Sequence, residues 1–175
     1  MRRYDYFMVP LVMDAGIAMA VLAVNLECQD LGATALQLGL IGTAWGIPYA
    51  LCCPVAGKAA ARVDRRWLML AGIFFYGLAV AFYGCATRPW HAIAAAPIGG
   101  LGCALFWPCF ETLLHGPTAA ETRGRMGLFN VGWTVGILGG QALAGYHYAL
   151  LGPRWALWTI ALLVWANGLY LAWRT

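Results

Sequence analysis

The chain has 175 residues, of which 62% are hydrophobic and 10% are charged, and its formal net charge is +4 at pH 7. This composition excludes a water-soluble globular domain, because the charged side chains are too few to cover a surface that faces water. The positive charge does not indicate a nucleic-acid-binding protein, since the basic residues are spread between the apolar stretches.

Apolar stretches of about membrane-spanning length follow one another along the chain. A helix needs roughly 20 apolar residues to cross the hydrocarbon core of a bilayer, and its backbone polar groups must be satisfied inside the segment. We therefore predict an all-α membrane protein that forms a single domain over residues 1–175. The expected spans are 7–26, 37–57, 67–86, 92–114, 126–148 and 155–173.

The first stretch, 7–26, is expected to be a retained helix. A signal peptide preceded by Arg2 and Arg3 is the alternative, but the stretch is long and has no clear small-x-small cleavage site. It also contains Asp14, and a carboxylate at membrane depth is costly unless it faces protein or water. Asp14 and Asn25, which share a helical face, are candidates for a substrate or ion pathway. The alternative is that Asp14 reaches the inner interface or pairs with a buried polar group.

The fourth stretch, 92–114, ends in a second candidate group. Glu111 and His115 are four residues apart near its inner end, and Trp107 precedes Glu111 by one turn. One interpretation is that Glu111 and His115 form a pair at the membrane interface with a structural role only. The functional interpretation is a site beside Asp14 that binds and releases protons, since carboxylates in a low dielectric titrate nearer neutrality.

The fifth stretch, 126–148, carries two patterns. A polar stripe of Asn130, Thr134 and Gln141 is hard to place against lipid and is expected to line a cavity. Small residues at four-residue spacing allow close helix packing in membranes. They are Gly132, Gly136 and Gly140.

Basic residues predict the orientation. With the N-terminus in the cytoplasm, nine basic residues lie inside and two, Arg88 and Arg154, lie outside, which is a strong positive-inside bias. Both termini are then cytoplasmic. The nine are Arg2, Arg3, Lys58, Arg62, Arg65, Arg66, Arg123, Arg125 and Arg174.

The chain resembles itself at an offset of 88 residues. Residues 39–67 and 127–155 share eight identities in 29 ungapped positions, including Trp45 with Trp133 and Arg66-Trp67 with Arg154-Trp155. We expect two three-helix repeats, about 1–88 and 89–175, of which the second is inverted. Inverted repeats of three helices are a construction principle of secondary transporters. A duplicated bundle without a transport role is the alternative.

Several motifs resemble the major facilitator superfamily. The stretch "GKAAARVDRRWLML" is similar to its loop between the second and third helices, with Gly57, Arg62, Arg65 and Arg66 matching, Ala61 in place of the usual acid and Asp64 in place of a glycine. "GLGCALFWP" resembles the fourth helix, and "ETRGRMGLFNVGWTVGILGGQALAG" resembles the E-x-R-G-R loop and the fifth helix. An arginine often found early in the fourth helix of proton-coupled members is absent near Ala96.

The resemblance implies the N-terminal six-helix half of a twelve-helix transporter. We expect secondary transport of a small solute, with a second six-helix half as partner, either a missing C-terminal half or a second copy. The alternative is a membrane assembly or interaction subunit that transports nothing. No sequence motif of an enzyme, nucleotide site, cofactor or metal site is found, and the cysteines and histidines are scattered. The expected partners are the lipid bilayer and a small-molecule substrate, without nucleic acid, and the expected location is a bacterial plasma membrane.

Overall fold

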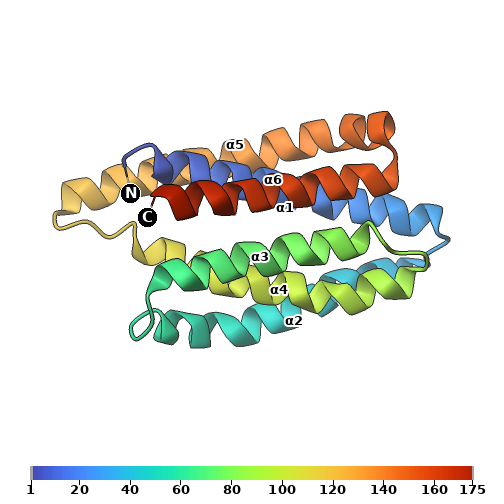
Figure 1. Cartoon of the computed structure of the whole chain (residues 1–175), viewed down its shortest axis with the longest axis horizontal. Coiled ribbons are helices and arrows are strands. Elements are labelled where there is room, and N and C mark those ends of the chain that lie inside the picture. The colour runs from blue at the N-terminus through green and yellow to red at the C-terminus, as the bar shows by residue number, and fades with distance from the viewer. Residues whose placement is uncertain (1, 175) are drawn as a thin grey trace.

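The computed structural model describes residues 2–174, and that part of the chain folds into six α-helices. The helices run along one long axis with alternating direction, and both chain ends lie at the same end of the bundle (Figure 1). The all-helical class predicted from composition is confirmed. The helices are α1 (Asp5–Asp30), α2 (Ala35–Ala59), α3 (Arg65–Tyr83), α4 (Pro89–Thr112), α5 (Ala119–Leu151) and α6 (Pro153–Arg174).

Five of the six helices are long and apolar enough to cross a membrane, and α5 is the exception. It is the longest helix, with 33 residues. Its hydropathy is lowered by the polar stripe, by its glycines and by the charged residues of its first turns, Glu121, Arg123 and Arg125. The expected span at 126–148 therefore lies on a helix that is long enough to cross a membrane but is less apolar than the other five.

The helix ends follow ordinary capping chemistry. Thr34 and Gln37 form a reciprocal capping box at the start of α2, and the side chain of Asp64 accepts a hydrogen bond from the backbone N–H of Arg66 at the start of α3. Gly152, with φ of +74°, ends α5 in a conformation that favours glycine. Pro153 then begins α6 at once, so only Gly152 separates the two helices.

Two of the motifs expected in loops lie largely on helices. Gly57 is in the last turns of α2, and Arg65 and Arg66 are the first residues of α3. The E-x-R-G-R segment occupies the start of α5, which begins at Ala119 because Thr118 caps it through the backbone N–H of Glu121. The polar character that suggested a loop is that of a helix extending past the membrane core.

The six helices pack as two groups. α1 packs mainly on α5 and α6, and α4 packs mainly on α3 and α2, while α3 and α6 join the two groups. Figure 1 shows α1, α5 and α6 above α2, α3 and α4. The largest fully buried side chains come from both groups: Phe106, Phe110, Met13, Met69, Ile73 and Leu157.

Two helices leave most of their surface uncovered. Only Ile41 and Ala56 are buried on α2. On α5 only Gly132, Gly136, Gly140 and Ala144 are buried, all on the face that meets α1. The outward faces of α2 and α5 carry exposed apolar side chains, including Ile47, Leu51 and Val55 on α2 and Leu138 and Leu143 on α5.

Candidate functional site

The seam between α1 and α5 is built by glycines. A Cβ added at Gly136 would lie 2.5 Å from the carbonyl oxygen of Leu11, and one at Gly140 would lie 2.6 Å from that of Ala15. Gly132 meets the backbone of Phe7 in the same way. Glycine at these positions lets the two helix backbones touch, which is how helices pack tightly where lipid supplies no hydrophobic drive.

Asp14 lies in this seam. Its side chain is only 3% exposed, and its Cβ is close to the position that a Cβ of Gly136 would take. The indole of Trp133 on α5 lies close enough to the carboxylate to interact with it. The second carboxylate oxygen, Oδ2, is buried without a hydrogen-bond partner, and no basic side chain within residues 2–174 forms an ion pair with Asp14. Such a group is costly, and in membrane proteins it marks a functional position by default.

The polar stripe of α5 differs from Asp14 in burial. Asn130, Thr134 and Gln141 are exposed on the faces of α5 that α1 leaves open. The stripe lies on the side of α5 that faces away from the seam, as its helical spacing from Gly132, Gly136 and Gly140 requires. The structure thus places Asp14 inside the seam and the stripe on the open surface of α5.

The candidates on α4 are separated by burial. Glu111 is exposed, whereas Trp107 is half-buried in an aromatic cluster. Its ring centroid lies 4.8 Å from that of Phe106 and 6.1 Å from that of Phe129 on α5. Trp107 therefore packs α4 against α5. His115 lies beyond the end of α4, and its backbone carbonyl accepts a hydrogen bond from Arg125.

A second feature is a cavity of about 210 Å³ between α1, α2 and α3. Asn25, a pathway candidate from the sequence, lines this cavity. Three aromatic residues that also line it were not predicted: Trp45, Tyr76 and Tyr83. Tyr76 and Tyr83 are seven residues apart and share a helical face, a signal that reads equally well as core packing. The other lining residues are Ile17, Ala20, Val21, Val24, Leu38, Ile41 and Gly42.

The basic end of the bundle is tied by hydrogen bonds between helices. Arg65 donates to the hydroxyl of Thr112 on α4 at 3.1 Å, and Arg66 donates to the carbonyl of Ala172 on α6 at 2.7 Å. The Nε of Arg66 is buried without a partner. Of the other motif residues, Gly57 and Arg62 are exposed. The motif therefore joins α3 to both of its neighbours.

A fully buried carboxylate at the same end escaped the sequence analysis. Asp5 accepts hydrogen bonds from the backbone N–H of Arg2, from the hydroxyl of Tyr170 at 2.7 Å and from the guanidinium of Arg174 at 3.1 Å. The Arg174 contact is an ion pair that joins the start of α1 to the end of α6. Because the partners are 165 and 169 residues apart, no local pattern could have shown it.

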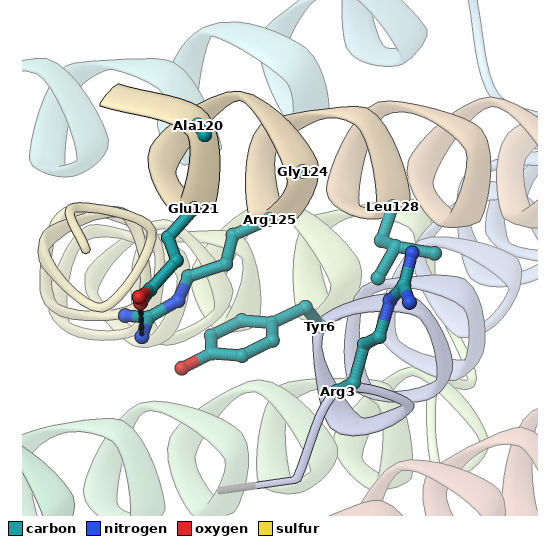
Figure 2. Close-up of a pocket in the computed structure, with 7 residues that line it drawn as sticks. All are labelled: Arg3, Tyr6, Ala120, Glu121, Gly124, Arg125 and Leu128. Carbon is teal, nitrogen blue, oxygen red and sulfur yellow. Dashed lines mark hydrogen bonds and ion pairs between the residues drawn. The ribbon is translucent and has the colours of Figure 1, made fainter. Parts of the chain in front are cut away.

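A hollow of about 470 Å³ opens beside the starts of α1 and α5 (Figure 2). Arg125 spans it: its guanidinium donates to the backbone carbonyl of Leu113, forms an ion pair with Glu121 and lies 5.2 Å from the ring centroid of Tyr6. Figure 2 shows Arg3 on the other side of Tyr6, pointing toward Leu128. Arg125 is therefore occupied in joining α1, α4 and α5.

The opposite end has its own link. The hydroxyl of Tyr148 on α5 donates to Asp30 at 2.8 Å and lies 3.3 Å from Glu27, both on α1. The α1–α5 seam is thus closed by Tyr148 at one end and by Arg125 at the other. Within residues 2–174 no group of three or more His, Cys, Asp or Glu side chains could hold a metal ion.

Comparison with known proteins agrees with this architecture. A family model described as "Major Facilitator Superfamily" matches residues 7–175. The chain is similar to a putative glycerol-3-phosphate transporter 2 of Arabidopsis thaliana, with 28% identity over 73% of the chain and 28% of that protein. It is 25% identical to a probable L-galactonate transporter of Escherichia coli, over 82% of the chain and 31% of that protein.

A third relative is the sugar phosphate exchanger 3 of Gallus gallus, which is 29% identical over 66% of the chain and 26% of that protein. The chain therefore spans less than a third of the length of each of these relatives. The resemblance inferred from the sequence motifs is confirmed by the family match, which covers almost the whole chain. This all-helical, multi-pass membrane chain belongs to the major facilitator superfamily.

Proposed function

We propose that the chain forms one six-helix half of a secondary transporter that moves a small solute by alternating access. The observation that carries the proposal is the family match over residues 7–175, joined by a buried carboxylate without a counter-ion, Asp14. In alternating access two halves rock about a central site. The chain supplies one half, equivalent to the N-terminal half of a twelve-helix transporter.

The uncovered faces of α2 and α5 support a second six-helix half as partner. These two helices have the fewest buried residues of the bundle, and they belong to different helix groups. A partner that contacts both would bridge the groups and enclose the space between them. The partner is either a further six-helix segment or a second copy of this chain.

The helix contacts also support an inverted repeat. Exchanging α1, α2 and α3 with α4, α5 and α6 turns the α1–α5 contact into the α4–α2 contact, and both are major. Trp45 on α2 lies against Gly99 of α4, and its repeat mate Trp133 on α5 lies against Asp14 of α1. Each tryptophan thus lies at one of the two contacts, which supports the proposed repeat.

The charge distribution supports an orientation with both termini in the cytoplasm. The basic segments named above, the two chain ends and the connections before α3 and α5 all lie at one end of the bundle (Figure 1). Positive charge is enriched on the cytoplasmic side of membrane proteins. A bacterial plasma membrane is the location that we propose.

Asp14 is assigned to ion coupling. It lies where α1 and α5 touch, so protonation would remove the cost of burying its charge and change how closely the two helices pack. The relatives are named for solutes as different as glycerol 3-phosphate and galactonate, and a transport test must therefore use a panel.

The test is uptake into proteoliposomes that contain the complete transporter, with and without a proton gradient. Labelled glycerol 3-phosphate, L-galactonate and glycerol form the panel. We expect gradient-driven accumulation of one of them, reduced about tenfold or more by Asp14→Asn, while Asp64→Asn, at the cytoplasmic cap of α3, behaves as the wild type. Unchanged accumulation by Asp14→Asn would remove Asp14 from coupling. Absence of any uptake by the wild type would favour an assembly subunit.

A further inference from the structure

The cavity between α1, α2 and α3 carries polar groups that the protein itself does not use. The hydroxyls of Tyr76 and Tyr83 and the indole N–H of Trp45 form no hydrogen bond to another group within residues 2–174, although both tyrosines are at least 95% buried. Asn25 donates through its Nδ2 to the carbonyl of Val21, which leaves its amide oxygen free. The wall therefore offers the donors of Trp45, Tyr76 and Tyr83, and acceptors on Asn25 and on the two tyrosine hydroxyls.

None of the side chains that line this cavity is charged. The basic residues of the chain lie at helix ends or in the connections between helices. An anion that entered the cavity would lose its hydration and gain no counter-charge, which is costly. An uncharged molecule would pay no such cost and would meet unpaired donors.

The aromatic wall is fixed in place before a ligand binds. A Cβ at Gly100 would collide with the carbonyl of Trp45, so α2 and α4 are in backbone contact at this level. The indole of Trp45 stacks on Tyr49, with ring centroids 5.0 Å apart. A side chain held in this way loses little freedom on binding, and binding sites gain affinity from such preorganisation.

The size of the cavity limits the ligand. Pockets for drug-sized molecules have volumes of about 300–1,000 Å³, whereas this cavity has about 210 Å³. We propose that it binds an uncharged organic group of about one ring, which accepts hydrogen bonds from Trp45, Tyr76 and Tyr83, and that it selects against anions. The proposal rests on the proposed transport function, since it names the substrate class of that path.

The test uses two probes of equal shape, neutral 4-hydroxybenzamide and anionic 4-hydroxybenzoate. Their binding to the complete polypeptide in nanodiscs is measured by ligand-observed NMR titration. We expect the amide to bind about tenfold or more tightly than the carboxylate. Tyr76→Phe and Tyr83→Phe should each weaken binding of the amide about fivefold, which is the usual scale for one hydrogen bond. Tyr146→Phe, a change on the exposed surface of α5, should have no effect.

A charge introduced at the cavity sharpens the test. Val21 lines the cavity and is 54% exposed, so an arginine can be accommodated there. Val21→Arg should reverse the order of the two probes. Tighter binding of the carboxylate by the wild type, lack of saturable binding of the amide, or wild-type affinity in both tyrosine variants would each overturn the proposal.

Failure of this proposal is distinct from failure of the transport function. Selective binding of the amide without uptake of any solute would leave the cavity assignment standing and remove the transport proposal. Gradient-driven uptake restricted to anions, together with preferred binding of the carboxylate, would leave transport standing and remove the cavity assignment.

Discussion

Two buried carboxylates near the start of α1 have opposite surroundings. Asp5 accepts hydrogen bonds from Arg2, Tyr170 and Arg174 and forms an ion pair with Arg174. Asp14, nine residues later, has one indole partner and a bare oxygen. A buried charge with a full set of partners holds the structure together. A buried charge without such partners can gain or lose a proton during function. We therefore assign Asp5 to the framework and Asp14 to the coupling.

The assignment of Asp5 predicts a stability effect. Asp5→Asn keeps the shape of the side chain and removes the charge that Arg174 needs, and breaking a buried ion pair by removing one partner is strongly destabilising. We expect the melting temperature in detergent to fall by about 5 °C or more. Glu111→Gln, which changes an exposed acid on α4, is the control and should melt as the wild type. Equal melting of both variants would contradict the framework role.

Helix existence and helix ends differ in how well the sequence predicts them. The apolar stretches and the caps at Thr34, Asp64 and Thr118 are local signals, and the helices lie where those signals are. The start of α5 was misplaced, since charged residues such as Arg125 were interpreted as a loop. The helix includes Arg125 because it begins at the Thr118 cap, and the guanidinium of Arg125 reaches the carbonyls of Leu113 and His115, a contact that composition does not show.

The candidate site was predictable only in part. Exposing Asp14 or a polar stripe to lipid costs free energy, and this cost follows from residue type alone. The sequence therefore identifies both. The burial of Asp14 in the seam depends on how α1 is rotated against α5, which the glycines of α5 determine by backbone contact. The cavity was missed because its lining comes from three helices, with Trp45 on α2 and Tyr76 and Tyr83 on α3, and each aromatic residue has the character of an ordinary core residue.

At the scale of helix pairs, Gly136 and Gly139 on α5 allow the effect of helix packing on stability to be measured apart from the effect of helix propensity. A Cβ at Gly136 would lie 2.5 Å from the carbonyl oxygen of Leu11, whereas one at Gly139 would meet no atom within 4 Å. Alanine favours a helix over glycine by about 1 kcal/mol. We expect Gly139→Ala to leave melting in detergent unchanged or raised and Gly136→Ala to lower it. Lower stability of Gly139→Ala than of Gly136→Ala would show that α1 and α5 do not touch there.

At the scale of the whole molecule, the bundle has one basic end and one nearly neutral end, and this asymmetry predicts its orientation. The connection before α3 lies at the basic end and the connection before α4 lies at the other, with Val63 and Thr87 exposed in them (Figure 1). Neither residue is charged, so replacing either leaves the positive-inside bias intact. Single cysteines at these positions therefore report orientation without altering its cause.

The measurement starts from a variant in which Cys28, Cys52, Cys53, Cys85, Cys103 and Cys109 are replaced. Val63→Cys and Thr87→Cys are then introduced separately, and intact cells are treated with a membrane-impermeant maleimide. We expect Thr87→Cys to be labelled in intact cells and Val63→Cys only after the membrane is permeabilised, because the basic end is held in the cytoplasm. The reverse pattern would invert the orientation and place Asp5 and Arg174 at the outer surface. Their ion pair would still join α1 to α6, because it depends on helix packing and not on orientation.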